Sequence, residues 1–350
     1  MYPNTHNCKL YIDGHKVDSL GDVSFSDTGN NTLQSLSAKF TDADLANFSL
    51  LNKKIEFFLD NGNYDGAPLF RGYIREYNSQ DTSVSVKAQD IRVFLTGDGV
   101  LPVIIDDKEN YDGFTIVQFL QDYIKNVVNT EETIISEDTL KEMDKPVFMT
   151  GVRETTTPYD YIKKALDKKI DGDTNIDRLQ DYSIFTYMMD IIHYNDTSGV
   201  TIRKTRNLED NYDYIFTYQD GIQSLKYKKR APPSRGMSNF EGQQVIFEYG
   251  NSPQGKKGMK IEAEGESRGE IRENMIPHVM LEQNNDKEIN LKVTKCFDIG
   301  INSIIHISVE DKDISGNYRV TSKSIKAGSG GISCNLTCNN KPLKLSDYLN

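Results

Sequence analysis

Two stretches with a regular alternation of apolar and polar side chains, one near each end of the chain, constrain the fold most. The first is "LFRGYIREYNSQDTSVSVKAQD", residues 69–90, in which two such arms flank a polar turn. Its apolar positions are Phe70, Ile74, Val84, Val86 and Ala88. Successive side chains of a strand point to opposite faces, so a period of two is typical of half-buried strands. This stretch therefore predicts a β-hairpin, with Arg71 on the face opposite the apolar one.

The second stretch, "NYRVTSKSIKAGSGGISCNLTCNN", residues 317–340, has the same design. A first arm leads into a Gly/Ser turn, and the second arm places Ile332, Cys334, Leu336 and Cys338 on one face. Two similar hairpins in one chain predict two related β-domains, one near each end. The length of 350 residues agrees with more than one domain, because a single hydrophobic core rarely organises so many residues.

The pattern of predicted elements divides the chain into three parts. Residues 1–97 and 216–350 show short alternating runs and turn signals typical of β-domains. Residues 98–215 contain two runs with apolar residues at helical spacing, which predict amphipathic helices over 114–128 and 158–170. No series of alternating strands and helices is visible. The expected fold class is mainly β, with a mixed helical insert between two β-domains.

Composition and charge argue against several classes of protein. The formal net charge is -11, whereas a protein that grips phosphates needs clustered Lys and Arg. The one basic run, "KYKKRAPPSR" at residues 226–235, is interpreted as a solvated strand end followed by a linker. No run approaches the roughly 20 apolar residues of a membrane span. The N-terminal residues lack the apolar core of a signal peptide, so the chain is expected to be assembled in a cytoplasm.

One segment resembles a catalytic motif. "GESRG", residues 265–269, matches the G-x-S-x-G pattern of serine hydrolases, and Asp298 and His306 follow in hydrolase order. That motif requires a strand, a sharp turn and a helix within a parallel α/β sheet, which the flanking charged segments do not predict. A surface loop is therefore expected, and a serine esterase that uses Ser267 remains the rival hypothesis.

The sequence predicts neither a metal site nor a cofactor site. "DKDISG", residues 311–316, begins like a calcium loop, but Ser322 stands where a bidentate Glu is needed, so a turn between strands is expected. Cys334 and Cys338 lie too far apart along one strand to form a disulfide with each other and are expected to be buried thiols. His193 and His306 are interpreted as core or interface residues.

The segment over residues 51–95 resembles the first barrel of the central baseplate hub proteins of contractile-tail phages. This family includes late-control hub proteins and the N-terminal part of type VI secretion spike proteins. Its pattern is a strand, a small loop, "lF.G.I", a polar turn, an alternating strand and "a.D....L". The matching positions are Leu69, Phe70, Gly72, Ile74, Ala88, Asp90 and Leu95. The C-terminal part resembles the second barrel, with Gly316 and Tyr318 entering the long hairpin.

The resemblance implies two tube-like β-barrels, over residues 1–97 and 216–350, that flank an intervening domain. It implies a homotrimer whose six barrels form a pseudo-sixfold ring between a hexameric tail tube, or tube-initiator protein, and a separate trimeric spike. Tape-measure and wedge proteins are further expected partners, DNA would pass through the ring, and the location would be the virion tail. No enzymatic activity is implied. The expected ring-hairpin positions are Phe70, Gly72, Ile74, Val84, Val86, Ala88, Asp90, Gly316, Tyr318, Ile332, Cys334 and Leu336.

Two alternatives remain besides the esterase. The chain could be a different structural tail protein, such as a tube or distal-tail protein, although a tube protein usually has a single barrel. It could also be the hub of an injection system that derives from a phage.

Overall fold

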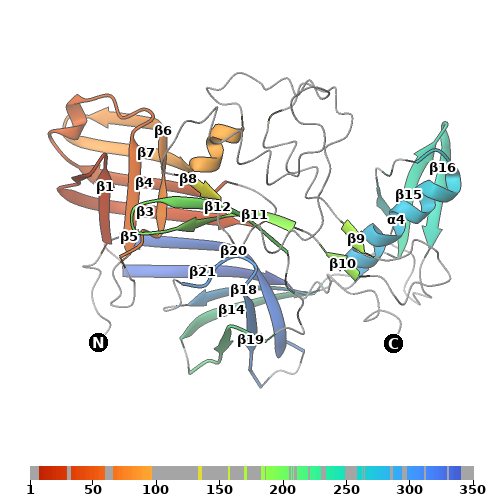
Figure 1. The fold of residues 1–350 in the computed structure, drawn as a ribbon. Helices are drawn as coiled ribbons and strands as arrows, with labels where there is room; N and C mark the ends of the chain where they lie inside the picture. The colour runs from red at the N-terminus through yellow and green to blue at the C-terminus, as the bar shows by residue number, and fades with distance from the viewer. Residues whose placement is uncertain are drawn as a thin grey trace. The chain divides into compact units, whose positions relative to one another are not determined.

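The structure is a computed structural model, shown as a ribbon in Figure 1, and it is mainly β. Its contacts group into two compact units, one of Met1–Asp167, Tyr187–Lys204 and Lys323–Cys334, the other of Lys168–Thr186, Thr205–Ser322 and Asn335–Asn350. The residues described are 8–29, 33–59, 66–96, 133–135, 157, 169–171, 183–185, 187–204, 206, 208, 211–219, 221–229, 234–248, 258–261, 263, 265–283, 287–293, 298–310, 313–328 and 331–339.

The first unit contains an antiparallel ladder whose hydrogen-bonded neighbours follow the order β2-β1-β5-β6-β7-β4-β3. Its strands are β1 (Cys8–Ile12), β2 (His15–Lys16), β3 (Ser19–Thr28), β4 (Ser35–Thr41), β5 (Lys54–Leu59), β6 (Phe70–Gln80) and β7 (Ser83–Asp90). The hairpin predicted over residues 69–90 is confirmed as β6 and β7. Asp13 and Gly14 join β1 to β2 with positive φ, as this kind of short turn requires.

The first unit also contains a three-stranded sheet in the order β11-β12-β8. Its strands are β8 (Thr133–Ile135), β11 (Tyr187–His193) and β12 (Ser198–Lys204), and two short 3-10 helices, η1 (Leu45–Asn47) and η2 (Ile91–Leu95), follow β4 and β7.

The second unit is organised by a ladder in the order β13-β19-β20-β21-β18-β14. Its strands are β13 (Tyr214–Phe216), β14 (Ile222–Lys229), β18 (Lys287–Val293), β19 (Ile304–Ile307), β20 (Gly316–Gly328) and β21 (Gly331–Asn339). The hairpin of β20 and β21 is shared, because its tip over residues 323–334 groups with the first unit. There β20 also pairs with β3.

Between β14 and β18 the chain forms a small module of its own. Its elements are β15 (Arg235–Phe240), β16 (Gln243–Glu248), β17 (Gly258–Lys260) and α4 (Arg268–Gln283). The helix packs on the three-stranded sheet through a buried cluster that includes Val245, Phe247, Ile271, Met275 and Val279. A separate pair of short strands, β9 (Lys169–Asp171) and β10 (Ser183–Phe185), also belongs to the second unit.

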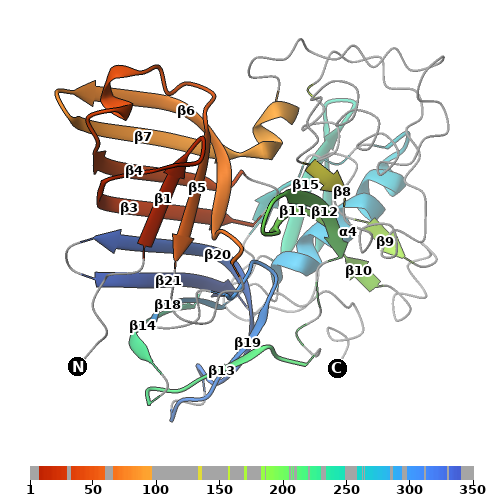
Figure 2. The same cartoon turned by 60° about the vertical axis from the view of Figure 1, so that its left-hand side comes forward.

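The two ladders have the same topology. Taken in chain order, β1, β3, β4, β5, β6 and β7 correspond to β13, β14, β18, β19, β20 and β21, and each set pairs in the same order (Figure 2). The ladders differ at one end, because β1 runs antiparallel to β5 whereas β13 runs parallel to β19. The repeated strand order shows that the chain contains the same structural plan twice.

The register of the two hairpins is also repeated. Phe57 pairs with Phe70 across β5 and β6, and Ile305 pairs with Tyr318 across β19 and β20, at the same separation along the chain. Under this alignment the last residue of β6 corresponds to the last residue of β20, and the first residue of β7 to the first of β21. The similarity seen in the sequence therefore reflects equivalent positions in two equivalent ladders.

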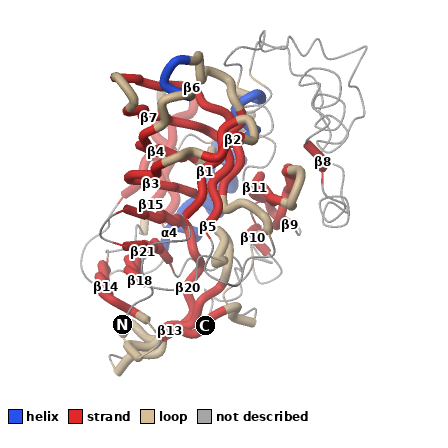
Figure 3. The backbone as a smooth tube through the Cα atoms, turned by 90° about the vertical axis from the view of Figure 1, so that its left-hand side faces the viewer, coloured by secondary structure: helices blue, strands red, loops and turns tan. Residues whose placement is uncertain are grey.

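Several expectations need correction. The described strand pairings leave both ladders open, so they show no closed barrel (Figure 3). Part of the loop expected after the basic run is strand β15, and residues 265–269 lead into helix α4. Lys169–Asp171 is a strand where the second predicted helix was expected to end. The rest of that helix and the helix over 114–128 lie outside the described residues. The domain limits at 97 and 215 stay a prediction.

The close approach of β6 to β7 requires glycine at position 72. A Cβ on Gly72 would lie inside van der Waals contact of the carbonyl oxygen of Gln89 and 2.7 Å from Cζ of Phe70. A backbone atom on a paired strand cannot move away without breaking the ladder. Gly300, by contrast, has nothing within 4 Å of its Cβ position and no positive φ.

We expect Gly72→Ala to lower the free energy of unfolding of the chain by about 1–3 kcal/mol or more, as overpacking does. Gly300→Ala is the matched control and should leave it nearly unchanged. Chemical denaturation followed by circular dichroism measures both variants. Equal unfolding curves for the two would show that β6 and β7 do not approach each other in this way.

Candidate functional site

A buried arginine on β6 holds a neighbouring loop of the first unit. The side chain of Arg71 is 5% exposed although it lies on the face opposite Phe70. Its Nε donates to Oε1 of Glu56 at 2.6 Å, and its Nη1 and Nη2 donate to the carbonyl oxygens of Tyr194 at 3.1 Å and Asn195 at 2.7 Å. Nη1 also donates to the carbonyl of Thr197. The turn between β11 and β12 is therefore fixed to β6 through its own backbone.

A second arginine anchors the same hairpin at the end of β7. Arg92, 2% exposed, donates from Nη2 to Oδ2 of Asp90 at 2.7 Å and from Nη1 to the carbonyl of Met189 at 2.6 Å. Asp90 accepts two backbone N–H groups as well, those of Arg92 at 2.8 Å and Gln34 at 2.5 Å. Asp90 thus caps η2 and neutralises Arg92 at once. This explains why the "D....L" pattern follows the hairpin.

Further ionisable side chains surround this pair. Burial raises the pKa of Asp27 to about 6, the charge of Asp190 adds to the effect, and Arg92 opposes it. Burial lowers the pKa of His193 to about 3, against the raising effect of Asp90. His193 is hydrogen-bonded through Nδ1 to Oγ of Ser198 at 2.9 Å. The carboxylates and cations are thus mutual partners, and the cluster is suited to anchoring rather than to proton transfer with a substrate.

The two shifted groups should act on stability in opposite directions below neutral pH. Unfolded His193 binds a proton below its ordinary pKa of 6.5, whereas the folded form does not until about pH 3, so its contribution is lost as pH falls. Folded Asp27 binds a proton below about pH 6, whereas the unfolded form binds one only below its ordinary pKa of 3.8. The contribution of Asp27 to the free energy of unfolding is therefore lost as pH rises.

As pH falls from 7 to about 4.5, we therefore expect the stability of His193→Gln to rise relative to that of the natural chain. Over the same range, the stability of Asp27→Asn should fall relative to that of the natural chain. Unfolding midpoints at both pH values measure the difference. A difference from the natural chain that is independent of pH for both variants would contradict the burial of these groups.

The second unit repeats the arginine anchor at the equivalent position. Arg319 on β20 corresponds to Arg71 on β6, is also buried, and donates from Nε to the carbonyl oxygen of Arg206 at 3.0 Å. Its neighbour Tyr318 donates its hydroxyl to the carbonyl of Ile314 at 2.8 Å. Each ladder thus uses an arginine on its fifth strand to hold the backbone of a segment distant in sequence. Neither anchor was predicted from the sequence, although the arginine shared by the two hairpins at matched positions is the signal that could have shown them.

The ring-hairpin positions named from the sequence lie mostly in the cores of the ladders. Fully buried members are Phe70, Gly72, Ile74, Val84, Val86, Ala88, Asp90, Tyr318, Cys334 and Leu336, while Ile332 and Gly316 are half-buried. Cys334 and Cys338 are buried and are not joined in a disulfide, as expected. These residues shape the hairpins, and what the hairpins contact in an assembly stays a prediction.

The segment that resembles a hydrolase motif is the start of helix α4. Ser267 is its N-cap, because its Oγ accepts the backbone N–H of Glu270 at 3.2 Å, and Oε2 of Glu270 accepts the N–H of Glu266 at 2.8 Å. Serine followed three residues later by Glu is a capping-box signature. Asp298 accepts the hydroxyl of Tyr214, and His306 is hydrogen-bonded to Asn317, so neither contacts the other. The surface loop expected here is therefore a helix cap.

The structural and the catalytic interpretations of Ser267 can be separated by two substitutions. Ser267→Ala removes the cap and should cost about 1 kcal/mol of stability, while Ser267→Asp keeps a good cap without a nucleophile. We expect no labelling of the natural chain by a fluorophosphonate probe. Labelling that disappears equally in both variants would establish a reactive serine.

A metal site is not found among the residues that the structure describes. They contain no group of His, Cys, Asp and Glu that could hold a metal ion. None of the described helices is long and apolar enough to cross a membrane. The turn expected over "DKDISG" is confirmed where it is described, between β19 and β20.

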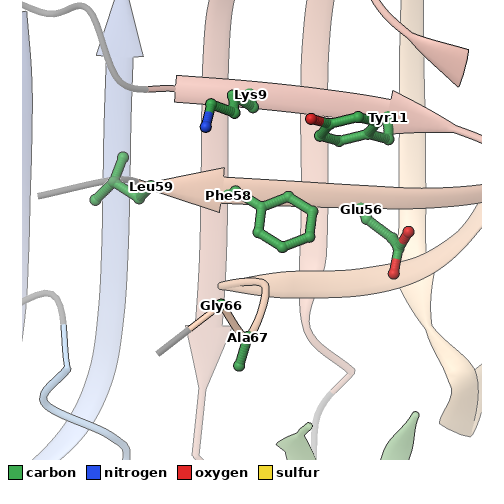
Figure 4. Close-up of a pocket in the computed structure, with 7 residues that line it drawn as sticks. All are labelled: Lys9, Tyr11, Glu56, Phe58, Leu59, Gly66 and Ala67. Atoms are coloured by element: carbon green, nitrogen blue, oxygen red, sulfur yellow. The ribbon is translucent and has the colours of Figure 1, made fainter. Parts of the chain in front are cut away.

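A hollow of about 450 Å³ lies on β1 and β5 (Figure 4). The rings of Tyr11 and Phe58 meet there edge to face, with centroids 5.5 Å apart. Glu56 lines the hollow, and its carboxylate is occupied by Arg71. Lys9 is the other charged side chain among the described residues of the lining.

Two solved structures with the same fold are tail proteins. A tail protein from Neisseria meningitidis MC58 is 9% identical with a TM-score of 0.63, over 97% of this chain and 98% of its own. The 43 kDa tail protein of prophage MuSo2 from Shewanella oneidensis is 10% identical with a TM-score of 0.64, over 96% and 98%. The sequence itself matches no family model and no curated protein.

A component of the Escherichia coli type VI secretion system also shares the fold. It is 12% identical with a TM-score of 0.54, over 94% of this chain and 76% of its own, and is itself similar to the T4 tail proteins gp27 and gp5. The resemblance to phage tail and type VI secretion proteins, expected from the hairpins, is therefore confirmed at the level of fold.

Proposed function

We propose that the chain is the structural hub of a contractile-tail baseplate, which joins a hexameric tail tube to a trimeric central spike. The observation that carries this proposal is the repeated ladder, because one chain contains the same six-stranded plan twice with hairpins in matching register. The shared fold with phage tail proteins over nearly the whole chain supports the tail as its location.

The repeat gives a physical reason for a trimer. Three copies with two similar domains each would form a ring of six similar units, which matches a sixfold tube on one face. The exact symmetry of the same ring is threefold, which suits a threefold spike on its other face. A closed ring also satisfies every heterologous contact, as closed symmetry requires. We propose two barrel-like domains for each copy, and a central channel enclosed by the six domains of the ring.

The chemistry of the chain agrees with a passive conduit. The formal net charge of -11 would repel phosphates rather than hold them, so a genome could pass without stalling. The buried ionic groups of the first unit are paired with one another, and Ser267 is engaged as a helix cap. We therefore propose a non-enzymatic role in the virion, with tape-measure and wedge proteins as further contacts.

The mass of the assembled particle tests this proposal. The full chain, alone at high concentration or with its co-expressed spike protein, should give an assembly of three copies of the 39.7 kDa chain by light scattering. A stable dimer, or a monomer that persists in both conditions, would contradict the hub.

A hub of an injection system is the second candidate. The fold shared with a type VI secretion component favours it, because such a system would use the same ring without a genome to eject. The presence or absence of a capsid in purified particles distinguishes the two, while the trimer is common to both.

A further inference from the structure

The pairing of β20 with β3 has no counterpart among the described strands, because the equivalent strands β6 and β14 are not paired with each other. On one edge, β20 pairs with β19 only from Gly316 to Arg319. Its opposite edge is occupied by β21, and it also pairs with β3. The hairpin arm of the second ladder, residues 323–328, therefore joins the edge strand of the first ladder. Gly328 lies directly against the side chain of Asp22 on β3, which places the tip of the arm there.

The equivalent arm of the first ladder is β6 beyond Ile74. It pairs with β5 only up to Tyr73, and the backbone of Ile74 bonds to Asn52 and Lys53. From Arg75 to Gln80 it pairs with β7 alone among the described strands. The counterpart of β3 in the second ladder is β14, which pairs with β18 alone among the described strands. Among the described strands, one arm and one edge strand of each chain thus have a second edge to which no strand is paired.

The two edge strands carry opposite charge. β3 contains Asp22 and Asp27 and no basic residue, and it accepts an arm, β20, whose charged residues are all basic. β14 is the reverse, because its charged residues are Lys226, Lys228 and Lys229 and all three are exposed. Like charges on adjacent strands are destabilising, so β20 would be repelled by β14. The basic run singled out in the sequence therefore has a place in the ladder.

The arm of β6 carries the acid that β14 lacks. Glu76 is exposed on β6, where it contacts Lys87 of β7 at 3.0 Å, and the neighbouring Arg75 is turned to Oδ1 of Asn52 at 2.8 Å. A lysine of β14 beside Glu76 would extend this contact into an alternating row of charges across three strands. Against β3, the same Glu76 would face the exposed Asp22.

Exposed apolar residues lie along the same arm. The segment from Ala46 to Asn52 follows β6, since the carbonyl of Ala46 accepts the hydroxyl of Ser79 at 3.0 Å. Within this segment the side chains of Phe48 and Leu51 are 66% and 50% exposed. Large apolar side chains exposed together commonly mark a contact surface.

We propose that β14 of one copy pairs with residues Arg75–Gln80 of β6 in a second copy, and that the opposite charges of β3 and β14 direct each arm to its correct edge strand. The inference rests on the proposed ring and names the junction between its copies. Within a chain β20 meets β3, and between chains β6 meets β14. The ring would then repeat one kind of junction six times, three within and three between copies. Lysines on β14 that merely protect an exposed edge are the competing explanation.

A carbodiimide, which couples adjacent carboxylate and amine groups directly, tests the junction. The full-length chain is prepared as a mixture of unlabelled and heavy-isotope-labelled copies, cross-linked at high concentration and analysed by mass spectrometry. We expect Glu76 linked to Lys226 or Lys228 in peptides of mixed isotope, which can form only between copies. The contact of Glu76 with Lys87 is the internal control, because it must form within one copy.

The outcomes separate the junction from the ring. Trimers in which the control link forms but the link to β14 does not would overturn this inference and leave the hub intact. A chain that is monomeric at every concentration and forms only the control link would contradict both.

Charge exchange gives a second, independent readout. Glu76→Lys alone, or Lys226→Glu with Lys228→Glu, should abolish trimers, while all three changes in one chain should restore them. Mixing the two defective chains should give open assemblies but few closed trimers, because an odd ring cannot alternate two kinds of copy. Lys39→Glu, on an interior strand, is the matched control and should not affect assembly. Normal trimers from each defective chain would overturn the proposal.

Discussion

The fold depends on how the edge strands of its β-ladders are paired. An edge strand presents a row of N–H and C=O groups, which pair with another chain if nothing of their own chain covers them. The first ladder meets this demand at β3, which is covered by the arm of the second hairpin. The edge of β3 is therefore closed by backbone hydrogen bonds to a strand of the second hairpin. In the ring that we propose, the arm of the first hairpin meets the same demand between copies.

The buried arginines solve a related problem for the segments that follow the ladders. A guanidinium has five N–H donors and is costly to bury unless they are satisfied. Arg71 donates to the carboxylate of Glu56 and to backbone carbonyls of one turn. In the second unit, Arg319 donates to the backbone carbonyl of Arg206. Breaking such a contact leaves an unpaired buried charge, so the ladders and these segments are fixed together. Equivalent arginines in equivalent strands also support a common origin of the two halves.

The sequence predicted those parts of the fold that depend on neighbouring residues. The hairpins followed from the period of two in their apolar side chains. The burial of Arg71 did not follow, because its acceptors are carbonyls of residues more than a hundred positions away. The extent to which the ladders stay open was likewise not predictable, since it is decided by long-range pairing.

Helix α4 was missed for a different reason. Its first turn carries a capping box, yet the same residues fit a hydrolase pattern, and Pro277 interrupts the helical run in sequence. Its apolar residues Ile271, Met275 and Val279 do recur at helical spacing and could have revealed it. The sequence identified the hairpin positions of the candidate site. Only the contacts show that most of them are core residues and that Asp90 caps η2 and pairs with Arg92.

The central claim is that one structural plan occurs twice in this chain so that three copies can present six similar units. A cryo-electron microscopy map of the assembled protein, at a resolution that separates strands, measures this directly. The account predicts six ladders around the ring, alternating between the two halves of the chain, with Arg71 and Arg319 at equivalent places. A map in which the two halves have different strand orders, or in which only one of them lines the ring, would contradict it.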